Sequence, residues 1–176
     1  GKMSRMISQL DSVVIGVNDL DAAAEDYVAL VGKAGEQVAF RGAESVSFQL
    51  VNTCLRLVGT TERQGMKQLV FGSPDLEAAR RRLPNVGVDV LEGDSDDNFL
   101  ALNPETTRSV NLAVAAEREI VSEDLASEGA LAGLDHAVVA SGDGDFTSAL
   151  LSGRLQLDMR LDLTNQDWDS RLMFFR

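Results

Sequence analysis

The strongest constraint on the fold of this 176-residue chain is an order of strand-like and helix-like segments that occurs twice. Residues 10–17 form a β-branched run, and Asp19 then supplies an N-cap before apolar residues at helical spacing through Val31. The same order returns at residues 68–72 and at the Pro74-Asp75 helix start. Short extended segments follow each helix, at 37–40, 45–51 and 54–58, and again at 88–91, 99–102 and 110–114. Two repeats, at about 7–59 and 66–116, predict a pair of duplicated half-barrels.

A third unit is expected after an acidic stretch rich in Ala, Ser and Gly, residues 117–132, which is typical of a linker. Residues 134–140 favour a strand and 143–151 a helix, and residues 156–163 and 171–175 favour two more extended segments. This order is one strand short of the repeat. A free strand edge can pair with another chain, so we expect a homo-oligomer, such as a dimer, or packing of this unit on the first domain.

Composition excludes several partners. The formal charge of −12 would repel nucleic acid, and the basic run Arg80-Arg81-Arg82 lies within an amphipathic helical pattern rather than on a basic face. The longest apolar stretches, such as 13–17, are far shorter than the roughly 20 residues of a membrane-spanning helix, so no membrane association is expected. The single cysteine, Cys54, excludes an intrachain disulfide and suits a reducing compartment, so we expect a cytoplasmic protein.

Strand alternation separates two faces of the predicted sheet. One face is wholly apolar and should pack under the helices; it comprises Val13, Ile15, Val17, Leu55, Leu57, Leu69, Phe71, Val110, Leu112 and Val114. The other is mixed and should line a pocket; it comprises Ser12, Val14, Gly16, Cys54, Arg56, Gln68, Val70, Asn111 and Ala113.

Several motifs resemble the vicinal-oxygen-chelate superfamily of glyoxalases, bleomycin-resistance proteins and extradiol dioxygenases. They are the run Leu-Asp-Ser-Val-Val-Ile-Gly-Val at 10–17, the related Leu-Asp-His-Ala-Val-Val at 134–139, Asn-Thr-Cys-Leu-Arg-Leu at 52–57, and Asp-Leu-x-Ala-Ala at 19–23 and 75–79. The resemblance implies an α+β fold in which paired βαβββ modules form a cupped mixed sheet. It further implies a complete domain at 1–116, a linker at 117–132 and a partial second domain at 133–176.

The resemblance also places metal ligands on the first and fourth strands of each repeat, where this chain has Ser12, Arg56, Gln68 and Ala113. A divalent cation needs carboxylate oxygen or imidazole nitrogen, which none of these residues supplies. We therefore expect a metal-free first domain whose ligand pocket contains Ser12, Arg56, Gln68 and Asn111. A structural salt bridge or a solvated position is the alternative role for Arg56, and hydrogen bonding to each other is the alternative for Ser12 and Gln68.

His136, the only histidine, stands at the family's first-ligand position in the third unit. It is the candidate for a divalent metal site, and a histidine hydrogen-bonded within the sheet is the alternative. Cys54 has no second histidine as an activating base and is expected to be a small core or pocket residue. Glu92, Asp94, Asp96 and Asp97 lack calcium-loop spacing and are expected to form a solvated acidic turn.

The leading hypothesis is a binding protein like those of the bleomycin-resistance branch, whose degenerate first domain holds a small, anionic molecule. The alternative is a metal-dependent glyoxalase-type isomerase or lyase, or an extradiol dioxygenase, with its site built around His136. A third hypothesis makes the first domain a scaffold for oligomerisation.

Overall fold

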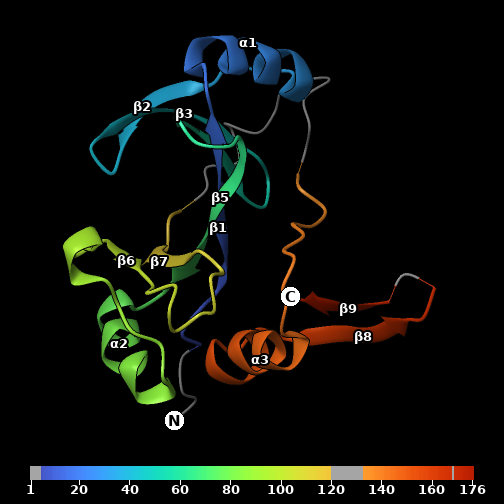
Figure 1. The fold of residues 1–176 in the computed structure, drawn as a ribbon. Coiled ribbons are helices and arrows are strands. Elements are labelled where there is room, and N and C mark those ends of the chain that lie inside the picture. Colours follow the sequence, from blue (N-terminus) through green and yellow to red (C-terminus); the bar gives the residue numbers. More distant parts are fainter. Residues whose placement is uncertain (1–4, 120–132, 168) are drawn as a thin grey trace.

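The computed structural model describes residues 5–119, 133–167 and 169–176 (Figure 1). Its main feature is a curled seven-stranded sheet with the strand order β2-β3-β4-β1-β5-β7-β6. The first half contains β1 (Gln9–Val17), α1 (Leu20–Val31), β2 (Glu36–Phe40), β3 (Ala43–Gln49) and β4 (Cys54–Gly59). The second half contains β5 (Gly65–Ser73), α2 (Leu76–Arg82), β6 (Phe99–Ala101) and β7 (Leu112–Ala116). The predicted α+β fold with paired modules in a cupped mixed sheet is confirmed.

Helices α1 and α2 each begin directly after an aspartate that the sequence predicts as the N-cap. Asp19 Oδ1 accepts a hydrogen bond of 3.0 Å from the amide of Ala22, and Asp75 Oδ1 accepts one of 2.9 Å from the amide of Ala78. Each bond satisfies an amide that has no partner within the first helical turn. α1 ends at Gly32, whose φ of 83° is the left-handed conformation that glycine adopts without strain.

The two halves meet at β1 and β5, which are antiparallel, whereas β1 is parallel to β4 and β5 is parallel to β7. Strand pairing is less extensive at the outer edge of the second half, beside β6. Residues 88–91, predicted as a strand, form only an isolated bridge from Val90 to Leu102, and a 3-10 turn at Glu92–Asp94 follows. The chain there turns away after one pair, so a full ladder does not form.

The apolar face predicted from alternation is the core. Val13, Val17, Leu55, Leu57, Leu69, Phe71, Leu112 and Val114 belong to one buried cluster, with Ile15 and Val110 packed against it. The opposite face holds a smaller cluster of Val14, Val70, Phe99, Ala101 and Ala113. The sheet therefore has one face covered by helices and one concave face only partly filled by side chains.

The third unit departs from its prediction at its first segment. Residues 134–140 belong to no helix or strand. The side-chain amide of Asn52 accepts a hydrogen bond of 2.9 Å from the N–H of Leu134 and donates one of 2.6 Å to its carbonyl. The expected strand is thus wrong. In the first half, β4 lies between β1 and β3, and residues 133–176 contain no described counterpart of β4 that could join 134–140 to the other strands.

The predicted helix and the last two extended segments do form. α3 (Gly144–Ser148) continues as a π-helix (Ala149–Arg154), and β8 (Met159–Asn165) pairs antiparallel with β9 (Ser170–Phe175). Leu150 and Leu155 are fully buried in the main core cluster, so this helix is part of the core beneath the first domain. The β8–β9 hairpin projects from α3 away from the large sheet (Figure 1). Of the predicted linker, only residues 117–119 lie among those described.

Candidate binding site on the concave face

A hollow of about 310 Å³ opens on the concave face of the sheet. Its lining comprises Asp11, Ser12, Phe40, Arg56, Val70, Asn98, Phe99, Ala115, Ala116, Glu117 and Arg118. Its volume is at the lower end of the range of small-molecule pockets. Five of the lining side chains are apolar and six are polar, and four of the polar ones are charged. Of the predicted pocket residues, Ser12 and Arg56 lie here.

Asp11 is a lining residue that the sequence did not predict. The register of β1 against β5 shifts between Leu10 and Ser12, which places an extra residue in β1 at this point. Such a bulge breaks strict alternation, and both Asp11 and Ser12 line the hollow. Asp11 is only 6% exposed and accepts a hydrogen bond of 2.8 Å from Nε of Arg118. The available signal was a single charged residue in a strand whose other residues are uncharged.

Cys54 lies beside Ser12 in register and is buried. Burial raises the pKa of its thiol above the ordinary value, against the opposing effect of the nearby Arg56 and Arg118. A thiol that keeps its proton is a poor nucleophile. This agrees with the prediction of a small core or pocket-lining residue.

Arg56 projects from β4 on the concave face and is half-buried. Nη1 lies 3.3 Å from Oγ of Ser45, and the guanidinium carbon lies 4.6 Å from the centre of the Phe40 ring. Nε is buried and makes no hydrogen bond with any part of the chain that the structure describes. Among the described residues no carboxylate lies within 4.0 Å of this guanidinium, so the structural salt bridge considered for Arg56 is not found.

The rim of the hollow is held by contacts between opposite edges of the sheet. Arg41, in the β2–β3 turn, forms an ion pair of 2.5 Å with Asp96 and places its guanidinium 4.6 Å from the centre of the Phe99 ring. Away from the rim and within the second half, Glu92 forms an ion pair of 2.5 Å with Arg80 of α2. The acidic segment is exposed, as predicted for a solvated turn, but two of its carboxylates are paired with arginines.

Gln68 and Asn111 do not line this hollow. Nε2 of Gln68 donates a hydrogen bond of 3.1 Å to Oδ1 of Asn111, and Nδ2 of Asn111 donates one of 2.7 Å to the carbonyl of Lys67. Both residues line a second hollow, of about 320 Å³, between β5 and residues 139–142. The four predicted pocket residues therefore fall into two pairs, and Gln68 has Asn111 rather than Ser12 as its partner.

His136 lies outside both hollows, with its side chain 54% exposed. Its Nδ1 lies 2.8 Å from a carboxylate oxygen of Asp135, and its ring centre lies 6.2 Å from that of Phe174. Within the described part of the chain, no three His, Cys, Asp or Glu side chains come together as metal ligands would.

None of the helices among the described residues is both long and apolar enough to cross a membrane.

The ligand positions on the concave face do not fit a divalent cation. Of the positions that the resemblance assigns to metal ligands, Ser12 and Arg56 line this hollow, while Gln68 lines the second one. Ser12 offers a neutral hydroxyl, Ala113 has no donor atom, and Arg56 adds a fixed positive charge. These four side chains are a poor donor set for a hard cation, although the carboxylates of Asp11 and Glu117 also line the hollow.

No protein-family model and no curated protein sequence matches the chain. Solved structures do resemble it. A variant of the Streptomyces coelicolor methylmalonyl-CoA epimerase, in complex with 2-nitronate-propionyl-CoA, is 20% identical with a TM-score of 0.54, over 62% of this chain and 94% of that one. The Mycobacterium tuberculosis methylmalonyl-CoA epimerase is 19% identical with a TM-score of 0.57, over 66% and 93%. A Bacillus halodurans protein described as hypothetical is 14% identical with a TM-score of 0.53, over 64% and 96%.

These epimerases have the glyoxalase-like fold. They match 62% and 66% of this chain, which is about the fraction of its residues that forms the seven-stranded sheet and its helices. The seven-stranded sheet and its paired halves are those predicted from the repeats. The chain therefore has the fold of the vicinal-oxygen-chelate superfamily.

Proposed function

We propose that this protein binds a small anionic molecule in the concave hollow, without a metal ion and without chemistry, as the bleomycin-resistance branch of its fold does. The observation that carries the proposal is the guanidinium of Arg56. Its buried Nε has no hydrogen-bond partner among the described residues, and the Phe40 ring lies against the guanidinium. A buried charged donor that makes no hydrogen bond costs more than about 1–3 kcal/mol, and a ligand carboxylate or phosphate oxygen would recover that energy.

The shape of the guanidinium favours such a ligand. Nη1 is directed to Ser45 and the flat face to Phe40, which leaves the edge formed by Nε and Nη2. That edge can donate two parallel hydrogen bonds to one carboxylate. Solved structures with this fold hold small molecules, 2-nitronate-propionyl-CoA in one and methylmalonyl-CoA in another, which supports a small-molecule ligand here as well.

The test is a calorimetric and thermal-shift screen of small carboxylates and phosphates against the wild type, Arg56→Gln, and Arg63→Gln as a control at an exposed arginine outside the hollow. Loss of one charge-assisted hydrogen bond of about 1.5–3 kcal/mol should weaken binding by roughly 10- to 100-fold in Arg56→Gln. Arg63→Gln should bind as the wild type does. A screen in which no anion raises the melting temperature, or equal binding by Arg56→Gln, would overturn the proposal.

Absence of a metal requirement is tested by elemental mass spectrometry on protein purified without chelators or a metal-affinity step. We expect far less than one equivalent of nickel, zinc, manganese or iron per chain. Stoichiometric metal would instead support the enzyme hypothesis built on His136, for which the described residues offer only the Asp135 contact.

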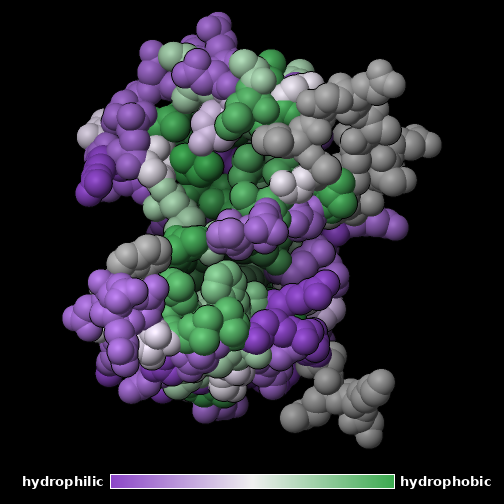
Figure 2. All heavy atoms as spheres, turned by 90° about the vertical axis from the view of Figure 1, so that its right-hand side faces the viewer, coloured by the Kyte–Doolittle hydropathy of each residue, from purple (hydrophilic) through white to green (hydrophobic). Residues whose placement is uncertain are grey.

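We also propose that the chain self-associates through the β8–β9 hairpin. One face of the hairpin carries the cross-strand pairs Leu161–Phe174 and Leu163–Leu172, and all four side chains are more than 40% exposed. Figure 2, which views the side from which the hairpin projects, shows apolar side chains gathered across the middle of that face. Exposed apolar side chains of this kind mark interaction surfaces.

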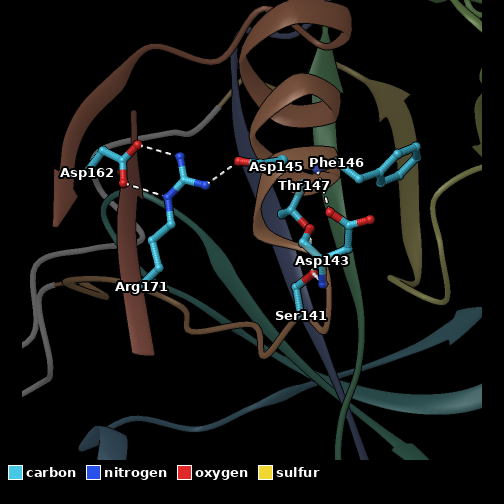
Figure 3. Close-up of polar contacts among 7 residues, drawn as sticks. All are labelled: Ser141, Asp143, Asp145, Phe146, Thr147, Asp162 and Arg171. Atoms are coloured by element: carbon cyan, nitrogen blue, oxygen red, sulfur yellow. Dashed lines mark hydrogen bonds and ion pairs between the residues drawn. The ribbon is translucent and has the colours of Figure 1, made fainter. Parts of the chain in front are cut away.

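The other face of the hairpin is fixed to the helix. Arg171 of β9 donates hydrogen bonds to Asp162 of β8 at 2.6 and 2.8 Å and to Asp145 of α3 at 2.5 Å (Figure 3). The hairpin is thus held in one orientation, while the outer edge of β9 has no strand beside it among the described residues. In the first half, the corresponding edge of β3 is covered by β4.

The occupant that we propose for this edge is β9 of a second copy, paired antiparallel about a twofold axis into a four-stranded sheet. Charge permits the pairing despite the net charge of −12, because within β9 the only charged side chain is Arg171, which is already neutralised by aspartates. Light scattering should give twice the 18.9 kDa chain mass, and Leu172→Glu should give a monomer. A wild type that is monomeric at every concentration would overturn this proposal.

A further inference from the structure

Two aromatic rings from opposite edges of the sheet form a corner of the hollow. Phe40 ends β2 and Phe99 begins β6, the first and last strands of the sheet order. Because the sheet is curled, the rings meet with their centres 5.8 Å apart and their planes at 84°. Both line the hollow. They therefore present two nearly perpendicular aromatic walls to whatever occupies it.

Each wall is fixed by an arginine. Arg56 lies 4.6 Å from the centre of Phe40, and Arg41 lies 4.6 Å from the centre of Phe99. Arg41 is itself held by its ion pair with Asp96. A guanidinium on a ring face is attracted by the ring quadrupole, so the four side chains support one another. A ligand that uses this corner has little side-chain ordering to bring about on binding.

From this arrangement we infer that the ligand is an aromatic carboxylate, with its carboxylate at Arg56 and its flat ring in the corner of Phe40 and Phe99. The inference rests on the proposed function, and it adds the chemical class. Aromatic pairs prefer offset-stacked or edge-to-face geometry, and a perpendicular corner offers both to one inserted ring. An aliphatic ring of the same size would gain only the burial of its surface.

The remaining wall suits a thin, small ligand. Val70 is 1% exposed, and Ala115 and Ala116 complete the apolar side with methyl groups alone. A hollow of about 310 Å³ suits a single ring with a short acidic side chain rather than a polycyclic molecule. The hollow contains one ion pair, Asp11 with Arg118, and one further carboxylate, the exposed Glu117. Arg56 is the lining cation that has no carboxylate within 4.0 Å among the described residues, and we assign the ligand carboxylate to it.

The test is calorimetric titration of the full chain with two matched pairs of ligands, benzoate with cyclohexanecarboxylate and phenylacetate with cyclohexylacetate. Each pair has the same charge and similar size. We expect the aromatic member to bind about three- to tenfold more tightly, which is the ratio expected from aromatic pairing beyond area burial. Phe99→Leu should lower this ratio while cyclohexanecarboxylate still binds, because one of the two aromatic walls is removed. Tyr27→Leu, on α1 and outside the hollow, should preserve the ratio.

The outcomes separate the two proposals. Equal affinity for both members of each pair overturns the aromatic inference and leaves anion binding intact, whereas no binding by any carboxylate removes the proposed function itself. If Phe99→Leu does not fold, intermolecular nuclear Overhauser effects decide the matter on the wild type. Contacts from the ring protons of bound benzoate to Phe40 and Phe99 are expected, and contacts only to residues outside the hollow would overturn the inference.

Discussion

Replacing Leu155 by alanine tests whether the helix of the third unit belongs to the core of the first domain. Leu155 has no exposed surface and packs, with Leu150, in the same cluster as the strands of the large sheet. A leucine truncated at such a site loses the transfer energy of its methyl groups and leaves a cavity, at a total of about 2–5 kcal/mol. We expect the free energy of unfolding to fall by about 3 kcal/mol.

For a chain of this size, each kcal/mol lowers the melting temperature by about 2–4 °C, so Leu155→Ala should lower it by roughly 6–12 °C. Urea unfolding followed by circular dichroism, together with calorimetry, measures both quantities. Leu30→Ala is the control, because that leucine is 64% exposed on α1 and should change stability by less than about 0.5 kcal/mol.

The two possible arrangements give different unfolding curves. If the helix is part of one core, a single transition shifts as a whole. If the third unit is instead an independent domain after a linker, calorimetry shows two transitions and Leu155→Ala moves only one of them. A loss below about 0.5 kcal/mol, or a split transition with the larger component unmoved, would refute the reasoning from burial.

Two further predictions concern titrating groups. Burial raises the pKa of the Cys54 thiol, so iodoacetamide at pH 8 should modify it far more slowly in the folded protein than in urea; equal rates would contradict this. The folded state keeps the thiol proton to higher pH than the unfolded chain does. The resulting contribution to the free energy of unfolding is therefore complete below about pH 8.5 and is lost as the pH rises. Cys54→Ala should reduce this loss of stability at alkaline pH. For Asp96, the amide of Asn98 and then Arg41 lower the carboxyl pKa, so its stabilisation is present above about pH 4 and is lost on acidification below it. Thermal melts between pH 5 and pH 3 should show a smaller decline for Asp96→Asn than for the wild type, and identical declines would argue against the Arg41 contact.

Local patterns account for what the sequence predicted well. The alternation of apolar residues in β1, β4, β5 and β7 assigned the core face correctly, because side-chain direction along a strand is a local property. Asp19 and Asp75 marked the helix starts for the same reason, since a cap involves only the next three residues.

Contacts between distant segments account for what the sequence missed. The bulge at Asp11 depends on how β1 pairs with β5, and it brings a second polar side chain into the hollow. The separation of Gln68 and Asn111 from Arg56 depends on where the third unit lies, since residues 139–142 complete the other hollow. The missing strand at 134–140 has the same origin, because β propensity alone does not make a strand without a neighbour to pair with.

The sequence by itself determined the fold class, the repeated halves of the sheet and the core face, because each depends on residue type and on local periodicity. Only the tertiary structure decided that Phe40 meets Phe99 and that Arg56 lies there with an unpartnered Nε. It also decided that Leu150 and Leu155 enter the main core. These features arise where a curled sheet brings its opposite edges together and a helix covers its outer face, and such closure depends on contacts between residues far apart in the chain.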